Sequence, residues 1–94
     1  MALEYRVTFY RMEDGEVPLV EFLESLRREN PTLHKLVAAG LKKLRSRDFH
    51  GPPLTKRIDD EGIFELRVGG TDIPRVFFFF RPGQEIVCTS GYVK

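Results

Sequence analysis

Two arginines lie within the most strand-like segments of this 94-residue chain. In residues 62–68, GIFELRV, apolar and charged residues alternate with a period of two, which predicts a half-buried strand with Arg67 on the side away from Leu66. Arg75 begins the next apolar run, RVFFFF. A guanidinium group is planar and permanently charged, so it suits two-pronged binding of a phosphate. The alternative is that Arg67 and Glu65 are ordinary exposed strand residues in cross-strand ion pairs.

Few other side chains suggest chemistry. His50 lies in the loop DFHGPP, and an imidazole is a natural general base near neutral pH, although a loop histidine is often simply exposed. His34 falls on the polar side of a predicted helix, and the two histidines lack the spacing of helical metal ligands, so we predict no metal and no cofactor. The acidic run at 59–61 is typical of a solvated turn. The single cysteine, Cys88, is predicted to be a buried, unreactive thiol.

Basic residues are concentrated in one part of a nearly neutral chain. Its net charge is +1, but residues 1–31 contain seven acidic and four basic residues, and residues 32–94 contain eleven basic and seven acidic residues. A local basic cluster can bind a polyanion. The alternative is a solvated helix end, where cations interact favourably with the helix dipole. The cluster comprises Lys42, Lys43, Arg45, Arg47, Lys56 and Arg57.

The apolar pattern predicts a single α+β domain over residues 1–94. An alternating N-terminal segment predicts a first strand, and two helical periods predict an antiparallel helical pair with Asn30 as the cap of the second helix. Short strand-like segments separated by turn residues then predict an antiparallel β-meander packed on the helices. The predicted ranges are a strand at 3–12, helices at 17–29 and 31–46, and strands at 54–58, 62–68, 73–80 and 84–90. The predicted core contacts of the helices are Leu23, Leu26, Leu36, Leu41 and Leu44.

The segment FFFF at 77–80 is apolar on both sides of its predicted strand. Phe77 and Phe79 share a face with Arg75, and the alternate residues share the other face with Val76. A strand with two apolar faces must be covered twice. Few residues remain in this chain to cover the second face, so a partner or a ligand is expected there.

No apolar run approaches the ~20 residues that a membrane-spanning helix needs. Charges at Glu4 and Arg6 interrupt the N-terminal segment, which is therefore not typical of a signal peptide. The sequence predicts a cytoplasmic protein.

Three tracts together resemble toxins of the RelE/ParE superfamily, and most of all its phage-derived, HigB-like branch. These are LTKRIDDEGIFELRV, PRVFFFF and IVCTSGYVK, and the resemblance covers about residues 17–94 in element order. It implies a RelE-like fold and a type II toxin that cleaves mRNA on the ribosome. Members usually carry an aromatic residue in place of Pro74 and continue beyond the closing lysine, so the resemblance also implies either a C-terminal truncation or a degenerate protein. Two alternatives are a ParE-like inhibitor of DNA gyrase, which is not an enzyme, and an inactive antitoxin-binding module.

The resemblance implies a role for each basic tract. Metal-independent RNA cleavage needs a base for the ribose 2′-hydroxyl, positive charge at the phosphate and an acid for the leaving oxygen. Arg67 and Arg75, on exposed strand sites facing the same way, would bind the phosphate. Lys56 would hold a flanking phosphate or act as a base, Lys94 would act on the leaving side, and His50 is a further candidate base. The remaining RNA-binding candidates are Arg57, Lys42, Lys43, Arg45, Arg47 and Tyr92.

The implied partners are mRNA, the ribosome and a cognate antitoxin of the helix-turn-helix, HigA-like kind. The antitoxin is expected to cover Phe77 and Phe79. No membrane partner is expected.

Overall fold

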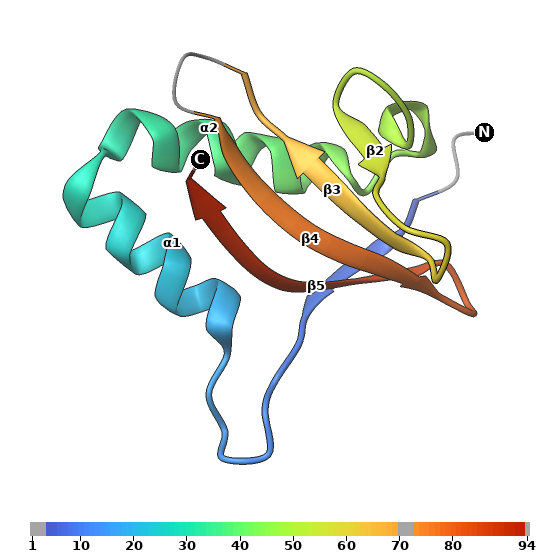
Figure 1. Cartoon of the computed structure of the whole chain (residues 1–94), viewed down its shortest axis with the longest axis horizontal. Coiled ribbons are helices and arrows are strands. Elements are labelled where there is room, and N and C mark those ends of the chain that lie inside the picture. Colours follow the sequence, from blue (N-terminus) through green and yellow to red (C-terminus); the bar gives the residue numbers. More distant parts are fainter. Residues whose placement is uncertain (1–3, 70–72, 94) are drawn as a thin grey trace.

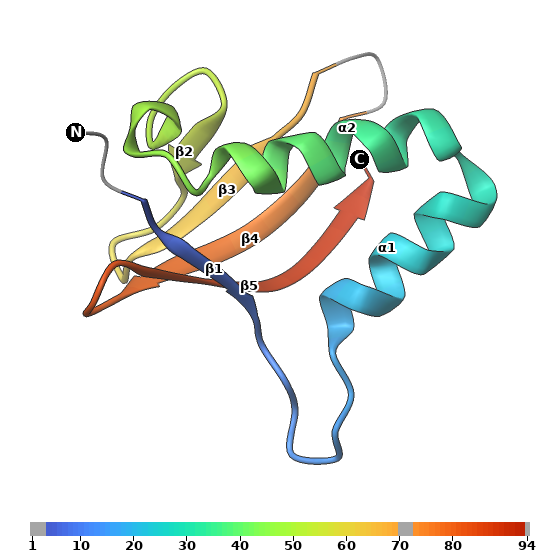
Figure 2. The same ribbon diagram turned by 180° about the vertical axis from the view of Figure 1, so that it is seen from behind.

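The computed structural model describes residues 4–69 and 73–93. Its strands form one five-stranded sheet in the order β1-β5-β4-β3-β2. Figure 1 shows this sheet with one face toward the viewer, and Figure 2 shows α2 crossing the opposite face. The elements are β1 (Arg6–Phe9), α1 (Pro18–Glu29), α2 (Pro31–Lys43), a 3₁₀ turn (Arg47–Phe49), β2 (Thr55–Arg57), β3 (Ile63–Arg67), β4 (Pro74–Arg81) and β5 (Glu85–Val93).

The predicted fold class, α+β with a strand, two helices and then a run of antiparallel strands, is confirmed. The placement of β1 adds one feature that the pattern did not predict. β1 pairs in parallel with β5, starting at Arg6 opposite Glu85, so the sheet is mixed. A parallel pair needs a long crossover connection, and both helices and the other strands lie between these two elements.

Both helices begin where their local signals predict, and α1 ends at Glu29 as predicted, but α2 ends at Lys43 and not at 46. Pro18 is the first residue of α1, and Pro31 is the first residue of α2. The side chain of Asn30 accepts a hydrogen bond from the backbone N–H of Leu33 at 3.2 Å, which satisfies one free donor at the start of α2. Because Asn30 alone separates the helices, the chain turns sharply there, and Figure 2 shows the helices opening as a V from this junction.

The core lies between the helices and the sheet. Of the five leucines predicted to face it, Leu26, Leu41 and Leu44 are buried and Leu23 packs against the buried cluster. The prediction for Leu36 is wrong, because its side chain is 42% exposed and Val37 is fully buried instead. Helical spacing alone leaves the two neighbours as alternatives, and the orientation of α2 on the sheet selects the row that contains Val37. The buried cluster comprises Leu19, Leu26, Val37, Leu41, Leu44, Leu66, Val68, Val76, Phe78, Ile86 and Cys88.

Two glycines allow the helices to approach the sheet closely. A Cβ atom on Gly40 of α2 would lie 2.6 Å from Cγ1 of Val68, and one on Gly91 of β5 would lie 2.7 Å from Cδ2 of Phe22 in α1. Neither distance is compatible with a side chain at the present spacing. In the sequence, these close contacts are therefore indicated only by glycine, the residue without a side chain.

A β-bulge in β5 changes which face its last residues occupy. Phe77 pairs with Ser90, but Phe78 pairs with Cys88, so Thr89 has no opposite residue. The Thr89 hydroxyl donates a hydrogen bond to the Phe77 carbonyl at 3.3 Å, which replaces part of the interrupted ladder. Since side chains alternate with a period of two, one extra residue moves Tyr92 to the face opposite the helices.

Candidate functional site

The sheet face turned away from α1 and α2, called here the outer face, collects several of the candidate residues. Arg67 of β3 lies opposite Arg75 of β4, and Arg75 lies opposite Tyr92 of β5. Lys56 of β2 is paired with Glu65, the next outer-face residue of β3. Among the described elements, no helix covers this face, which points toward the viewer in Figure 1. The structure therefore brings together Lys56, Arg67, Arg75 and Tyr92.

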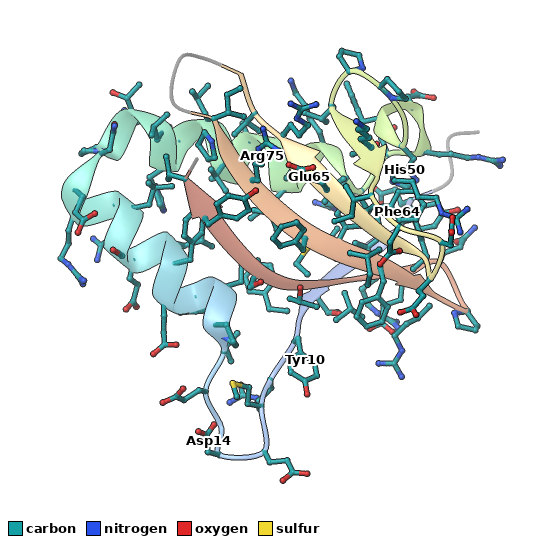
Figure 3. The ribbon with its side chains drawn as sticks, in the orientation of Figure 1. Tyr10, Asp14, His50, Phe64, Glu65 and Arg75 are labelled. Carbon is teal, nitrogen blue, oxygen red and sulfur yellow. The ribbon has the colours of Figure 1, made fainter. Side chains whose placement is uncertain are left out.

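Arg75 is held by a buried carboxylate. Its Nη1 lies 2.7 Å from Oε1 of Glu65, and the two side chains are only 13% and 6% exposed. Figure 3 shows the labelled pair side by side on β3 and β4. The expectation that Arg75 is exposed is therefore wrong. Its strand is central in the sheet, and its guanidinium lies against the buried carboxylate of Glu65.

One donor of this arginine has no partner. Its buried Nε lacks a hydrogen bond to any described residue. A buried donor without an acceptor is costly and often occurs at functional sites. Glu65 thus orients Arg75 without satisfying all of its donors.

Arg67 has different surroundings, although it is the register partner of Arg75. Within residues 4–69 and 73–93 its side chain forms no ion pair and no hydrogen bond. It lines an open pocket of about 440 Å³ together with Lys43, Phe49 and other residues. We call this the β3 pocket. Arg67 is consequently available to an anionic ligand, whereas Arg75 already has a counter-charge.

The two basic residues of β2 have different contacts. Lys56 is exposed on the outer face beside Glu65. Arg57 donates from Nε to the carbonyl of Asp59 at 2.9 Å and from Nη2 to the carbonyl of Asp60 at 3.1 Å. Arg57 thus stabilises the β2–β3 turn, and its RNA-binding role stays a prediction.

The remaining basic candidates lie away from the outer-face group. Lys42 and Lys43 occupy the last turn of α2 and are exposed. Arg45 lies beyond the helix with Nη2 3.5 Å from Oε1 of Glu4, and Arg47 is exposed in the 3₁₀ turn. Of these four residues, Lys43 lines the β3 pocket with Arg67.

His50 is packed inside an aromatic cluster. Its Nε2 lies 2.6 Å from the Leu44 carbonyl oxygen, and its ring meets Tyr5 edge-on at 4.7 Å and Phe80 at 5.3 Å between centroids. Figure 3 places His50 near Phe64 and apart from Arg75. These contacts explain the residue structurally, and the structure does not bring it to the arginines. Its role as a base stays a prediction.

Phe77 and Phe79 lie on the outer face, as predicted, and are half-buried. Phe77 stacks on Tyr92 with ring centroids 5.5 Å apart. The pairing of Phe79 with Ile63 and Val87 extends this apolar surface along the sheet. The faces of the FFFF segment are therefore confirmed. Lys94 lies outside the described residues.

Sequence reasoning missed Glu65 and Phe49. The sequence offers Glu65 only as an exposed strand residue in a cross-strand ion pair. The ion pair is present, with Arg75, but Glu65 is buried and belongs to the site. Phe49 lies in the 3₁₀ turn and is 38% exposed. An aromatic residue between a basic helix end and a proline pair was the available signal for it.

Cys88 is buried in the core, as predicted. Burial raises the pKa of its thiol from 9.0 to about 12, because the thiolate would lose its hydration. The described residues contain no group of three or more histidine, cysteine, aspartate or glutamate side chains with the arrangement of a metal site.

A protein-family model matches most of the chain. No protein with a curated description shows significant similarity to the chain. Among the described residues no helix is both long enough and apolar enough to cross a membrane. A family model described as "Phage derived protein Gp49-like (DUF891)" matches residues 21–94, which include most of α1, all of α2, the β3 pocket and the outer-face strands β2 to β5. The chain therefore belongs to the Gp49-like family of phage-derived proteins.

Proposed function

We propose that this protein is the toxin of a type II toxin–antitoxin pair and that it cleaves mRNA on the ribosome. The observation that carries the proposal is the arrangement of Lys56, Arg67, Arg75 and Tyr92 on one sheet face that no described helix covers. The resemblance to HigB-like toxins and the membership in a phage-derived family support the same function. The site of action is then the cytoplasm, where mRNA is translated.

The chemistry needs no metal ion or cofactor. The 2′-oxygen of a ribose attacks the adjacent phosphorus while the bond to the 5′-oxygen breaks, which leaves a 2′,3′-cyclic phosphate and a free 5′-hydroxyl. A base takes the 2′ proton, and an acid supplies one to the 5′-oxygen. Arg67 would stabilise the negative charge that develops on the phosphate oxygens.

The supporting residues have separable roles. Arg75, oriented by Glu65, would present its remaining donors to the same phosphate. Lys56 is the proton-transfer candidate on this face, and Tyr92 would stack on a base. Lys94 keeps the role on the leaving side that the family resemblance implies.

The partner would be an antitoxin that covers the outer face. Phe77 and Phe79 offer apolar contacts there, and Arg67 offers a cation for an acidic side chain. One helix or one added strand lying across β3 and β4 would bury both features together. Such binding would explain how a toxin of this kind is kept inactive.

The test is a translation reaction with a reporter mRNA and the purified protein. We expect cuts within the coding region when ribosomes translate the message, and none when its ribosome-binding site is mutated. The matched controls are Arg67→Ala, which should abolish the cuts, and Arg81→Ala, an exposed arginine at the end of β4 that should retain them.

Two results would contradict this function. Intact mRNA together with gyrase-dependent DNA breaks would select the gyrase inhibitor. Intact mRNA and intact DNA, with tight binding to the antitoxin, would select the inactive binding module.

A further inference from the structure

The β3 pocket lies where the basic end of α2 meets the edge of the sheet. Its walls are mostly apolar and come from Pro53, Leu54, Ile73 and the Phe49 ring. Lys43 and Arg67 provide its two cationic groups. No acidic side chain is found among the described residues that line it. At about 440 Å³ it falls within the range of roughly 300–1,000 Å³ that is typical of small-molecule sites. This composition suits a ligand with a flat apolar part and a negative charge.

The backbone of Phe49 is held in place by hydrogen bonds on both sides. The Phe49 N–H donates to the Ser46 carbonyl at 3.1 Å, and the Phe49 carbonyl accepts from the hydroxyl of Thr55, a residue only 2% exposed, at 3.2 Å. The residue as a whole remains 38% exposed. An accessible aromatic ring on a fixed backbone offers a stacking platform for a base.

One cationic group lies over this ring, and the other lines the same pocket. The ammonium group of Lys43 lies 5.5 Å from the centroid of the Phe49 ring. Since Lys43 is exposed and flexible, it can leave the ring for a phosphate oxygen when a ligand enters. Arg67 is fixed relative to the pocket wall, because its backbone N–H donates to the Leu54 carbonyl at 2.8 Å.

We propose that the β3 pocket binds one nucleotide of the RNA substrate, with its base stacked on Phe49 and a flanking phosphate bound by Lys43 and Arg67. The inference rests on the proposed function and adds a subsite to it. Arg67 belongs both to this pocket and to the outer-face row with Arg75, so a strand bound in the pocket would continue toward the outer face. The pocket would thereby set the register of the RNA at the arginines.

The experiment measures binding of the full chain to two fluorescent hexamers by anisotropy. One is 2′-O-methylated hexaadenylate, which cannot be cleaved at its blocked 2′-oxygens. The other is the same backbone with every base removed. Phe49→Ala should raise the Kd for hexaadenylate by about fivefold to 150-fold, the range for one stacked base, and should leave the abasic strand unchanged. Phe49→Trp should retain binding.

Matched variants separate a local effect from a general one. Phe9→Ala removes a phenylalanine of nearly equal exposure, 37%, from β1 at the opposite edge of the sheet, and should change neither Kd. Lys43→Gln should weaken both hexamers and reduce the salt slope by about 1, whereas Lys35→Gln on the same helix should not.

Several outcomes would overturn the inference. One is wild-type protein that does not bind hexaadenylate. Another is an equal loss of affinity for both hexamers in Phe49→Ala, which would show that the ring supports the fold and does not stack on a base. Adenosine monophosphate bound as tightly as the hexamer would indicate a site for free nucleotides instead of RNA.

The proposed function can fail separately. A base-dependent effect of Phe49→Ala, with no mRNA cut in translation reactions, would keep the pocket and reject the nuclease. Translation-dependent cleavage by a protein whose hexamer binding ignores Phe49 would keep the nuclease and reject the pocket.

Discussion

Arg67 and Arg75 are direct neighbours in the sheet, yet their side chains have different environments. Arg75 has a buried counter-charge in Glu65, and Arg67 lines an open pocket. The same substitution at the two sites should therefore have different consequences for folding. This difference separates a ligand-binding role from a structural one.

Arg75→Ala should destabilise the fold by about 3–5 kcal/mol, because it leaves the Glu65 carboxylate buried without a counter-charge. Arg67→Ala should change the free energy of unfolding by less than about 0.5 kcal/mol and abolish growth arrest. Urea melts and induced expression measure the two effects. The double variant Glu65→Gln/Arg75→Gln should lose less stability than the sum of the losses measured for Glu65→Gln and for Arg75→Gln. Equal melting midpoints for Arg75→Ala and wild type would show that the ion pair is not a stability determinant.

Cys88 should make the protein less stable in alkali. The thiol has a pKa of about 12 in the folded state, above its ordinary value of 9.0. The raised pKa therefore contributes its full amount to the free energy of unfolding below pH 9. This contribution decreases by about 1.4 kcal/mol per pH unit as the pH rises toward 12. The urea midpoint should decrease more between pH 8 and pH 10 in wild type than in Cys88→Ala. Parallel slopes would show that the thiol does not ionise on unfolding in this range.

At the scale of elements, α2 presents one face to the sheet and another to solvent. Leu41 is 8% exposed and Leu36 is 42% exposed on the same helix. Leu41→Ala should cost about 2–5 kcal/mol because it opens a cavity in the core. Leu36→Ala is the matched control and should cost less than about 0.5 kcal/mol. Denaturant melts that rank the two variants in the opposite order would mean that the buried face of α2 is assigned incorrectly.

The contact between α2 and β3 depends on Gly40. Alanine is favoured over glycine inside a helix by about 1 kcal/mol, but its Cβ would lie 2.6 Å from the branched side chain of Val68. We expect Gly40→Ala to destabilise the protein by about 1–3 kcal/mol. Adding Val68→Ala should recover part of that loss by making room for the new methyl group. A thermal melt in which Gly40→Ala is more stable than wild type would show that the helix can move away at no cost.

At the scale of the whole molecule, the two sheet faces have different coverings. The helices bury one face, and the outer face keeps Phe77 and Phe79 half-buried among cations. An apolar surface beside charged groups is typical of a site for a protein partner. The proposed antitoxin would complete the covering of the sheet.

Phe79→Ser should therefore weaken the complex with the proposed antitoxin by about thirtyfold or more, the scale of an interface hot spot. Lys42→Ala and Lys43→Ala should each have a smaller effect, and Phe9→Ser controls for loss of an exposed phenylalanine elsewhere. Titration calorimetry gives the affinities. Amide exchange should show protection of 74–81 in the complex. Protection restricted to 18–43 would mean that the antitoxin binds the helical side.

The sequence by itself determined the elements and the faces of most strands. Pro18, Asn30 and Pro31 specify the helix boundaries through local backbone chemistry, and the period-two alternation around Arg67 specifies β3. It also placed Phe77 and Phe79 with Arg75, because alternation along one strand is a local property. It predicted Leu36 as a core contact, wrongly, since helical spacing allows either the row of Leu36 or the row of Val37 to face the core.

Only the tertiary structure decided which distant residues meet. The parallel pairing of β1 with β5, the ion pair of Glu65 with Arg75 and the β3 pocket each join segments from different elements. The face of Tyr92 depends on the unpaired Thr89, because a single extra residue reverses every side chain after it. Composition and periodicity carry no information on that register, which is determined when the whole sheet and its helices pack together.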